Sequence, residues 1–457
     1  YYNLVFDSPA LTSNLNMGFT NHTISGDITI ANTNTGRWQL CGPVVDSSAT
    51  LNILGDVIHT GGNFATTGTG NGNTTIIINH YGDIIATAGN FSISRGSQGG
   101  TGTTNWYLHN GSITMSNVTT QNSNVSGARF VFMGNEQNLT LSNMSYGGGG
   151  LPIRVDDGAI VNLGTSVIQG NGAFTVNDFG GINTAQDSGF VQNLLTTGTV
   201  TLSSLGNYGY NGSVAQVTDN LLPVNVNDLT IDNAAGVTLI GTVQVFGILN
   251  LLSGNLHLDG NNINIGPAGV LIETPGNTVT GLTGSISAMG DLSAGVPNNV
   301  GGLGVMVTSD GNVTGMMVIR SHSEATGNGN EGIFRQYFID YLVDEDIPEL
   351  AVSVRFYYDE SELNSIPEAN LRVFHSTDFG NNWVGIGGTV NTTDNYVELT
   401  NFNELFLNFT LADVNNPIPV ELTSFSATTD GRSVKLDWIT ASEINNRGWN
   451  IERKYSE

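Results

Sequence analysis

Few residues in this chain have the types and spacing that chemistry requires, and the adjacent carboxylates Asp156 and Asp157 are the first candidates. An inverting glycosidase uses two carboxylates, one as general acid and one as general base. Such enzymes add nearby histidine and basic residues to hold an anionic sugar. After Asp157 none of these occurs until His257. The segment VDDGAI therefore favours a turn over a catalytic pair.

Basic residues, which a polysaccharide lyase needs as its base in a positively charged groove, are almost missing from the first 300 residues. The first lysine is Lys435, and the only arginines before residue 300 are Arg37, Arg95, Arg129 and Arg154. The sequence therefore predicts that the protein is not an enzyme.

Metal ligands are also poorly grouped. The seven histidines have no short-range metal spacing, and the one cysteine, Cys41, cannot complete a thiolate site. Two acidic groups could supply carboxylate oxygens to Ca²⁺: Asp344, Glu345, Asp346 and Glu349, and Asp359, Glu360 and Glu362. Neither has the spacing of an EF-hand, so solvated acidic loops are favoured. We expect no cofactor, with structural Ca²⁺ as the open alternative.

The net charge of −26 argues against nucleic acid as a partner, because phosphate binding needs clustered lysine and arginine. No apolar run is long enough to span a bilayer, so membrane insertion is not expected. The chain begins at Tyr1 with a strand-like segment, YYNLVFDS, which is typical of a mature product or a fragment. A single cysteine is compatible with either redox compartment.

The elements that would carry any site are short strands. From Val224 to Gly284 apolar residues alternate in brief runs that end at Gly, Asn or Asp, the pattern of strands with one buried face. Similar runs recur every 20–30 residues in the first half of the chain, which suits one turn of a β-helix. The sequence predicts an all-β protein that begins with a parallel β-helix over 1–285.

Asparagine and aromatic residues recur beside these strands. Asparagines stacked in a solenoid can bond from coil to coil, but surface turns explain them equally well: Asn52, Asn79, Asn138, Asn143 and Asn162. Six aromatic residues are expected to stack in the core: Phe64, Phe91, Phe130, Phe132, Phe174 and Tyr208.

Longer, aromatic-rich alternating strands over 286–413 predict a β-sandwich. Segment 414–457 begins with a stiff linker at Pro417 and Pro419. Alternating core positions follow: Phe425, Val434, Leu436, Trp438, Trp449 and Ile451. Only three strands fit there, whereas a complete sandwich of this type needs about seven.

Three regions of the chain carry a family resemblance. NDLTIDNAAGVTL and VFGILNLLSGNLHL resemble repeats of large secreted proteins of Bacteroidota and related phyla. GIFRQYFIDY and LRVFHSTDFGNNWVGIGGTV resemble the module that follows such repeats, although FNELFLNFTL departs from its usual end. The tail from Asn416 resembles the start of a fibronectin-like module preceding a type IX secretion sorting domain. The resemblance implies a secreted protein at the cell surface.

The sequence as a whole indicates a non-enzymatic extracellular structural protein. Chains are expected to assemble head to tail into fibres by strand complementation, with the protein itself as partner. The speculative contacts between subunits are Tyr1, Tyr2, Leu4, Phe6, Trp438, Trp449 and Ile451. The alternative is an adhesin that binds surface glycans through Trp38, Trp106 and Tyr107, and a polysaccharide-degrading β-helix enzyme is the third possibility.

Overall fold

The computed structural model confirms a nearly all-β chain with a parallel β-solenoid of about 11 turns. It describes residues 1–41, 48–68, 75–95, 102–122, 127–323, 332–341, 351–403, 407–415, 422–431 and 433–440. The chain divides into two compact units, which we call the solenoid unit (Tyr1–Leu256) and the second unit (His257–Glu457). β30 (Leu256–His257) is the strand at which the chain passes from one unit to the other.

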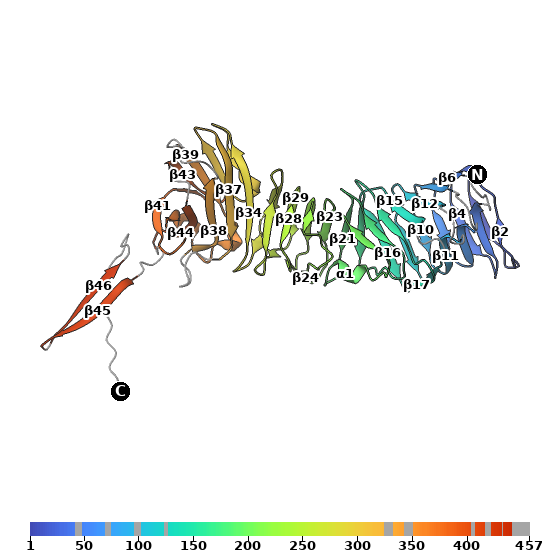
Figure 1. Cartoon of the computed structure of the whole chain (residues 1–457), viewed down its shortest axis with the longest axis horizontal. Coiled ribbons are helices and arrows are strands. Elements are labelled where there is room, and N and C mark those ends of the chain that lie inside the picture. The colour runs from blue at the N-terminus through green and yellow to red at the C-terminus, as the bar shows by residue number, and fades with distance from the viewer. Residues whose placement is uncertain are drawn as a thin grey trace. The chain divides into compact units, whose positions relative to one another are not determined.

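The solenoid unit winds through three parallel sheets, one strand per sheet in each early turn (Figure 1). The first sheet contains β1 (Leu4–Asp7), β4 (Ile28–Asn32), β7 (Val57–His59), β10 (Ile84–Ala86), β13 (Ile113–Ser116), β16 (Gln137–Ser142), β19 (Ile160–Gly164), β21 (Gly181–Thr184), β23 (Asn207–Tyr210), β26 (Asp228–Asp232) and β29 (Ile248–Ser253). The second sheet contains β2 (Leu15–Asn16), β5 (Arg37–Cys41), β8 (Asn63–Thr67), β11 (Gly89–Ser94), β14 (Val118–Thr120) and β17 (Ser145–Tyr146).

The third sheet contains β3 (Asn21–Ile24), β6 (Ser48–Ile53), β9 (Thr75–His80), β12 (Thr103–Leu108), β15 (Ala128–Phe132), β18 (Ile153–Val155), β20 (Phe174–Val176) and β22 (Val200–Leu202). The later turns add the parallel pairs β24 (Gln216–Val217) with β27 (Val237–Thr238), and β25 (Asn225–Val226) with β28 (Val243–Val245). The described residues contain one α-helix, the four-residue α1 (Phe190–Asn193).

Turn length agrees with the expected period. Ile28 pairs with Val57, 29 residues later, and Leu229 pairs with Leu249, 20 residues later. Because each side chain at an inward position lies over its equivalent in the previous turn, aromatic residues stack in the interior. Trp38 lies 5.8 Å from Phe64, and Phe64 lies 4.9 Å from Phe91. The six predicted core aromatics are all buried.

Asparagines bond from coil to coil, the first of the two explanations that the sequence left open. Asn79 donates its side-chain N–H to Asn52 at 3.0 Å, and Asn162 donates to Asn138 at 3.3 Å. Asn143 donates in the same way to Asn117 at 3.3 Å. These ladders satisfy amide groups that would otherwise compete for the backbone.

Aspartates form a second ladder, at a Gly-Asp turn that repeats before β4, β7 and β10. Asp27 Oδ1 accepts the backbone N–H of Asp56 at 2.9 Å, and Asp56 Oδ1 accepts that of Asp83 at 2.8 Å. The preceding glycines let the turns approach closely, because a Cβ added at Gly82 would lie 2.3 Å from the carbonyl oxygen of Gly55. Each turn therefore fixes the position of the next.

The second unit opens with solenoid-type strands and then changes to antiparallel pairing. Its longer sheet runs in the order β31 (Asn262–Ile265), β34 (Ser285–Leu292), β37 (Val313–Ser321), β38 (Gly332–Tyr341), β44 (Leu407–Asp413), β40 (Leu371–Ser376) and β41 (Val384–Gly387). The change occurs at β34, which pairs in parallel with β31 and antiparallel with β37. The predicted boundary at residue 285 falls at the first residue of this strand.

The shorter antiparallel sheet runs in the order β35 (Asn298–Asn299), β36 (Val305–Ser309), β39 (Val352–Tyr357), β43 (Tyr396–Phe402) and β42 (Thr389–Asn391). Further elements of this unit are β32 (Val270–Glu273), β33 (Val279–Thr280) and the 3₁₀ helices η1 (Val300–Gly302), η2 (Glu360–Glu362) and η3 (Glu368–Asn370). Phe356 of β39 lies 5.1 Å from Phe409 of β44, so aromatic rings join the two sheets.

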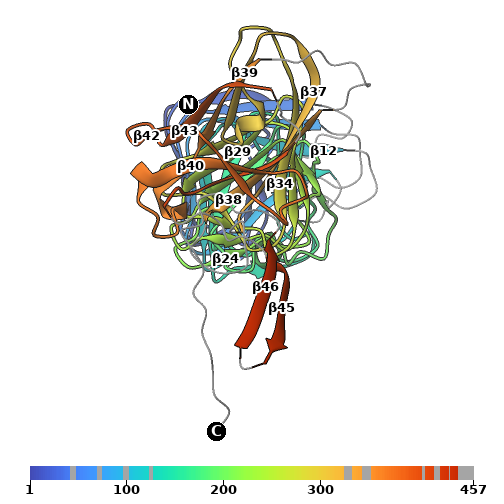
Figure 2. The same ribbon diagram turned by 90° about the vertical axis from the view of Figure 1, so that its left-hand side faces the viewer.

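The C-terminal described segment is a hairpin of β45 (Leu422–Asp430) and β46 (Ser433–Thr440), which lie side by side in Figure 2. Phe425 and Val434, predicted as core positions, are each 60% exposed. That prediction is wrong for both residues, because a two-stranded sheet has no second layer to cover them. The expected third strand, around Trp449 and Ile451, lies outside the described residues.

Candidate functional site

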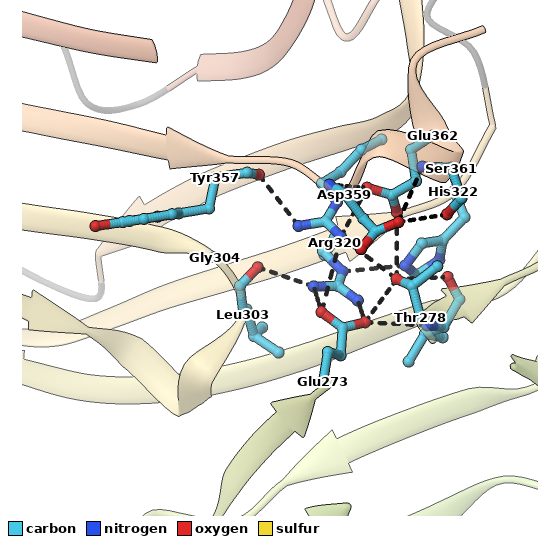
Figure 3. Close-up of polar contacts among 12 residues, drawn as sticks. Glu273, Thr278, Leu303, Gly304, Arg320, His322, Tyr357, Asp359, Ser361 and Glu362 are labelled. Atoms are coloured by element: carbon cyan, nitrogen blue, oxygen red, sulfur yellow. Dashed lines mark hydrogen bonds and ion pairs between the residues drawn. The ribbon is translucent and has the colours of Figure 1, made fainter. Parts of the chain in front are cut away.

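Four charged side chains meet inside the second unit, in what we call the charge cluster: Glu273, Arg320, Arg335 and Glu362 (Figure 3). Arg320 donates two hydrogen bonds to the Glu273 carboxylate, from Nη1 to Oε2 at 2.9 Å and from Nη2 to Oε1. Arg335 Nη2 lies 2.8 Å from Glu362 Oε2 and 3.7 Å from Glu273 Oε2. Two arginines and two glutamates balance in charge, as burial requires.

Strand alternation places both arginines inside. Arg320 shares its face of β37 with the buried Met316 and Val318, and Arg335 shares its face of β38 with the buried Ile333 and Tyr337. A side chain at such a position cannot reach water, so its charge needs carboxylate partners within the fold.

The two glutamates come from short connecting segments. Glu273 ends β32, and its Oε1 accepts bonds from Thr278 Oγ1 at 2.7 Å and from the Val279 backbone N–H at 3.0 Å. Glu362 closes a capping box in η2, where its Oε2 accepts the Asp359 N–H at 3.1 Å. The charge cluster therefore joins β32, β37, β38 and η2 through side chains that are also held by their own turns.

Neighbouring positive charges keep the carboxylate of Glu273 ionised. Burial alone would raise the pKa of Glu273, but the charges of Arg320 and Arg335 lower it well below its ordinary value. Burial and the same two arginines lower the pKa of His322, so its imidazole is neutral and its Nε2 accepts the Arg320 Nε–H at 3.0 Å. Burial raises the pKa of Tyr337, whose hydroxyl donates to the Leu303 carbonyl at 3.1 Å.

Acid–base catalysis needs a group that changes protonation near the working pH. Glu273 is held as a carboxylate and His322 as a neutral base whose Nε2 already has a donor. This arrangement suits an internal clamp better than a general acid. Removal of one partner from such a cluster typically costs about 3–5 kcal/mol, because an uncompensated charge stays buried.

A cleft of about 400 Å³ lies beside the charge cluster. Glu273 and Arg335 reach its wall, and the remaining wall includes Tyr357, Asp359 and Asn395. Asp359 accepts the backbone N–H of Gly276 at 2.8 Å and that of Ser361 at 2.9 Å. The cleft is therefore bordered by polar groups that have partners within the protein.

Of the two acidic groups considered as calcium ligands, only the second lies within the described residues. Asp344, Glu345, Asp346 and Glu349 lie outside the described residues. In the second group Glu360 is exposed, in agreement with a solvated loop. The prediction is wrong for Glu362, which is only 4% exposed and bonded to Arg335, and Asp359 is bound by backbone N–H groups. Within the described ranges, no three His, Cys, Asp or Glu residues are grouped in a way that could hold a metal ion.

The carboxylates Asp156 and Asp157 lie at a turn after β18, as expected, where the Ala159 N–H bonds to the Asp156 carbonyl at 3.0 Å. Arg154 holds the Asp156 carboxylate with two bonds, of 2.6 Å from Nε and 2.8 Å from Nη2. Both oxygens of this carboxylate are therefore occupied by the neighbouring arginine, as in a structural ion pair.

The glycan-stacking prediction is wrong for two of its three residues. Trp38 and Trp106 are both 0% exposed, because each occupies an inward position of its strand and stacks on core aromatics. Tyr107 occupies the next, outward position and is half-buried.

The residues predicted to join subunits fall in different parts of the chain. Tyr1 and Tyr2 are 63% and 78% exposed, whereas Leu4 and Phe6 are half-buried, with Phe6 stacked on Trp38 at 5.0 Å. Trp438 is half-buried in β46, and Trp449 and Ile451 lie outside the described residues.

Sequence reasoning missed the charge cluster. Arg320 in MVIRSH and Arg335 in IFRQYF interrupt apolar alternation at inward positions, and that signal was available. The partners Glu273 and Glu362 lie 47 and 27 residues away from Arg320 and Arg335, so pairing could not be inferred from spacing. The Gly-Asp turns, also missed, repeat visibly as SGD, LGD and YGD.

Comparison of the chain with protein-family models, with curated proteins and with solved structures found no match. In the part of the chain that the structure describes, helices are all too short or too polar to cross a membrane.

Proposed function

We propose that this protein is a non-enzymatic extracellular structural protein, a component of the cell surface or matrix, whose solenoid unit acts as a stiff spacer. The observation that carries the proposal is the set of side-chain ladders that run from turn to turn. Aromatic rings stack inside, and Asn and Asp side chains bond between turns outside. Bending such a stack requires several of these contacts to break together.

The proposal that the protein has no catalytic activity draws support from the charges. The buried carboxylates of the charge cluster are paired with arginines, and Asp156 is paired with Arg154. Both arrangements favour structural roles. An extracellular location is supported by the resemblance of NDLTIDNAAGVTL and of the tail from Asn416 to secreted surface proteins.

We extend the proposal to the second unit. Its two antiparallel sheets, joined by Phe356 and Phe409, are interpreted as a β-sandwich, and β45 and β46 as part of a fibronectin-like module. The charge cluster then serves as the internal clamp that fixes β32 to the antiparallel strands.

Self-assembly into fibres is the second part of the proposal. Exposed apolar side chains support it, on Tyr1, Tyr2 and Val5 in the first strand region and on Phe425, Val434 and Ile439 in the hairpin. Light scattering and negative-stain electron microscopy of the concentrated protein test this part. Filaments are the expected result. A protein that stays monomeric at high concentration would contradict the proposal of self-assembly but not the proposal that the solenoid unit is a spacer.

Hydrogen–deuterium exchange of the full chain tests the spacer. Amides of the stacked strands, such as β7, β10 and β13, should exchange slowly and at similar rates, since each strand is bonded on both sides. Exchange of these strands within seconds at neutral pH would show a unit too soft to act as a spacer.

The alternative function is an adhesin that binds surface glycans. With Trp38 and Trp106 in the core, this function needs other exposed rings, which Tyr81 and Phe179 provide.

A further inference from the structure

One corner of the solenoid unit stacks a single residue per turn along its surface. The residue after each strand of the third sheet donates its backbone N–H to the last strand residue of the previous turn. Thus His109 donates to His80 at 2.9 Å and Met133 donates to Leu108 at 3.0 Å. We call this row the corner column; its members are Leu54, Tyr81, His109, Met133, Asp156, Asn177 and Ser203.

The first part of the corner column is apolar and aromatic. Leu54, Tyr81 and Met133 are 48%, 43% and 40% exposed. The rings of Tyr81 and His109 are stacked at 4.6 Å with planes only 10° apart. Neighbouring turns of a solenoid are spaced about 4.8 Å apart, so the register itself holds these two rings face to face. They form a small stacked pair in which Tyr81 is exposed and His109 is half-buried.

The second part of the corner column enters a surface depression of about 840 Å³. Met133, Asp156, Asn177 and Ser203, from four successive turns, all line it, so it extends about 14 Å along the stack. Asp157, Asp178 and Phe179 also line the depression.

Polar groups in the depression are held in position by one another. Arg154 and Asn177 both donate to Asp156, the latter at 2.9 Å. Ser203 Oγ donates to Asp178. Asp157 is exposed at the turn that follows Asp156. The wall therefore offers carboxylate and amide groups whose orientation is set before any ligand arrives, which lowers the entropy cost of binding.

Phe179 supplies an aromatic face inside the same depression. It is 46% exposed and has a φ of +58°, a backbone region that bulky residues rarely adopt. Its N–H bonds to the Leu205 carbonyl at 2.8 Å, and its carbonyl accepts the Gly158 N–H at 3.3 Å. Bonds to both neighbouring turns thus hold the ring out towards solvent.

We propose that the depression at Asp156, Asp157, Asn177, Asp178, Phe179 and Ser203 is a binding site for a neutral glycan. Aromatic faces stack on the C–H faces of sugar rings, and carboxylates and amides bond to sugar hydroxyls. Arg154 balances the charge of Asp156, but Asp157 and Asp178 add negative charge that disfavours uronic acids and sulfated sugars, so the glycan is uncharged. The Tyr81–His109 surface extends the site along the corner column for a longer chain.

This inference rests on the alternative function of a glycan-binding adhesin. It does not depend on the spacer or on fibre formation, which are tested separately. The full chain is titrated by calorimetry with neutral oligosaccharides of galactose, mannose, glucose and xylose. Oligogalacturonate, chitosan oligomers and CaCl₂ are titrated in parallel. Binding of at least one neutral oligosaccharide, without binding of oligogalacturonate, is the expected result.

The variants F179A and D157N should each weaken that binding about tenfold or more, and F179Y should retain most of it. F379A is the matched control, since Phe379 is 85% exposed with a φ of +59° but lies in the second unit. It should bind as the wild type does. Thermal melts show that each variant is folded.

Absence of binding by the wild type to every neutral sugar at millimolar concentration overturns the proposal. So does undiminished binding by folded F179A and D157N, because the sugar then sits elsewhere. Selective binding of chitosan oligomers or Ca²⁺ would assign the depression to cations instead.

Discussion

Arg335 and Glu362 meet at 2.8 Å, and each side chain is only 4% exposed. The two residues come from β38 and from η2. Because both charges are almost fully buried, each needs an opposite charge beside it. This pair and the Arg320–Glu273 pair make the interior of the second unit depend on charge balance.

Replacement of Glu362 by glutamine should lower the free energy of unfolding of the second unit by about 3–5 kcal/mol, because Arg335 keeps its charge in the interior. Urea unfolding followed by hydrogen exchange of second-unit amides measures the loss. The control is E398Q, which breaks the Arg355–Glu398 pair, where the Arg355 side chain is 40% exposed. That pair should contribute less than about 1 kcal/mol. Equal losses of unfolding free energy in the two variants would contradict a special role for the buried Arg335–Glu362 pair.

Acid should destabilise the solenoid unit through His59 and His80. Burial lowers the pKa of each to about 4, from an ordinary value of 6.5. The unfolded chain therefore takes up protons first as the pH falls. Stability from these groups is complete above about pH 6.5 and declines between pH 6.5 and 4, by about 3 kcal/mol for each histidine.

Thermal melts of the full chain between pH 7.5 and 4 measure this decline. H59L should flatten the dependence, whereas H257A, which changes an exposed histidine, should leave it unaltered. A decline of unchanged steepness in H59L would show that other groups carry the acid sensitivity.

Alanine at Gly111 should disrupt the Gly-Asp turns. A Cβ there would lie 1.6 Å from the carbonyl oxygen of Gly82, which is backbone and cannot move aside. We expect a loss of several kcal/mol, in the range of severe packing or strain defects. G241A is the control, because a Cβ at Gly241 meets nothing within 4 Å. Circular dichroism melts compare the stabilities of G111A and G241A. Similar melting temperatures for the two variants would show that the Gly-Asp turns do not fix the spacing between solenoid turns.

The thiol of Cys41 should be inert in the folded protein. Burial raises its pKa to about 12, so almost none of it is thiolate at neutral pH. Reaction with a disulfide reagent such as DTNB should be slow in buffer and fast in urea, and its rate then reports opening of the solenoid unit. G111A should speed this reaction in buffer, and fast labelling of the wild type would refute the burial argument.

The sequence was most informative where one rule repeats. Alternation of apolar residues predicted the parallel solenoid, its turn length and its aromatic core, because alternate side chains of a strand point to opposite faces of its sheet. The same rule, applied consistently, would have placed Trp38 and Trp106 inside. They were instead assigned to glycans on residue type, which does not determine exposure.

Sites were harder to predict because they join residues from different turns. The corner column aligns Met133, Asp156, Asn177 and Ser203 only once the register of each turn is known. Loop length varies from turn to turn, so spacing in the sequence does not give that register. The charge cluster has the same origin, since nothing local links Arg335 to Glu362.

By itself, then, the amino-acid sequence determined the class of the fold, the placement of the buried strand faces and the scarcity of basic residues. These follow from local periodicity and composition, which every short segment carries. Only the tertiary structure decided that Asn79 bonds to Asn52, that Arg320 pairs with Glu273 and that Phe179 and Met133 line one depression. Such contacts depend on how coils stack and sheets close, which long-range packing fixes and no single segment encodes.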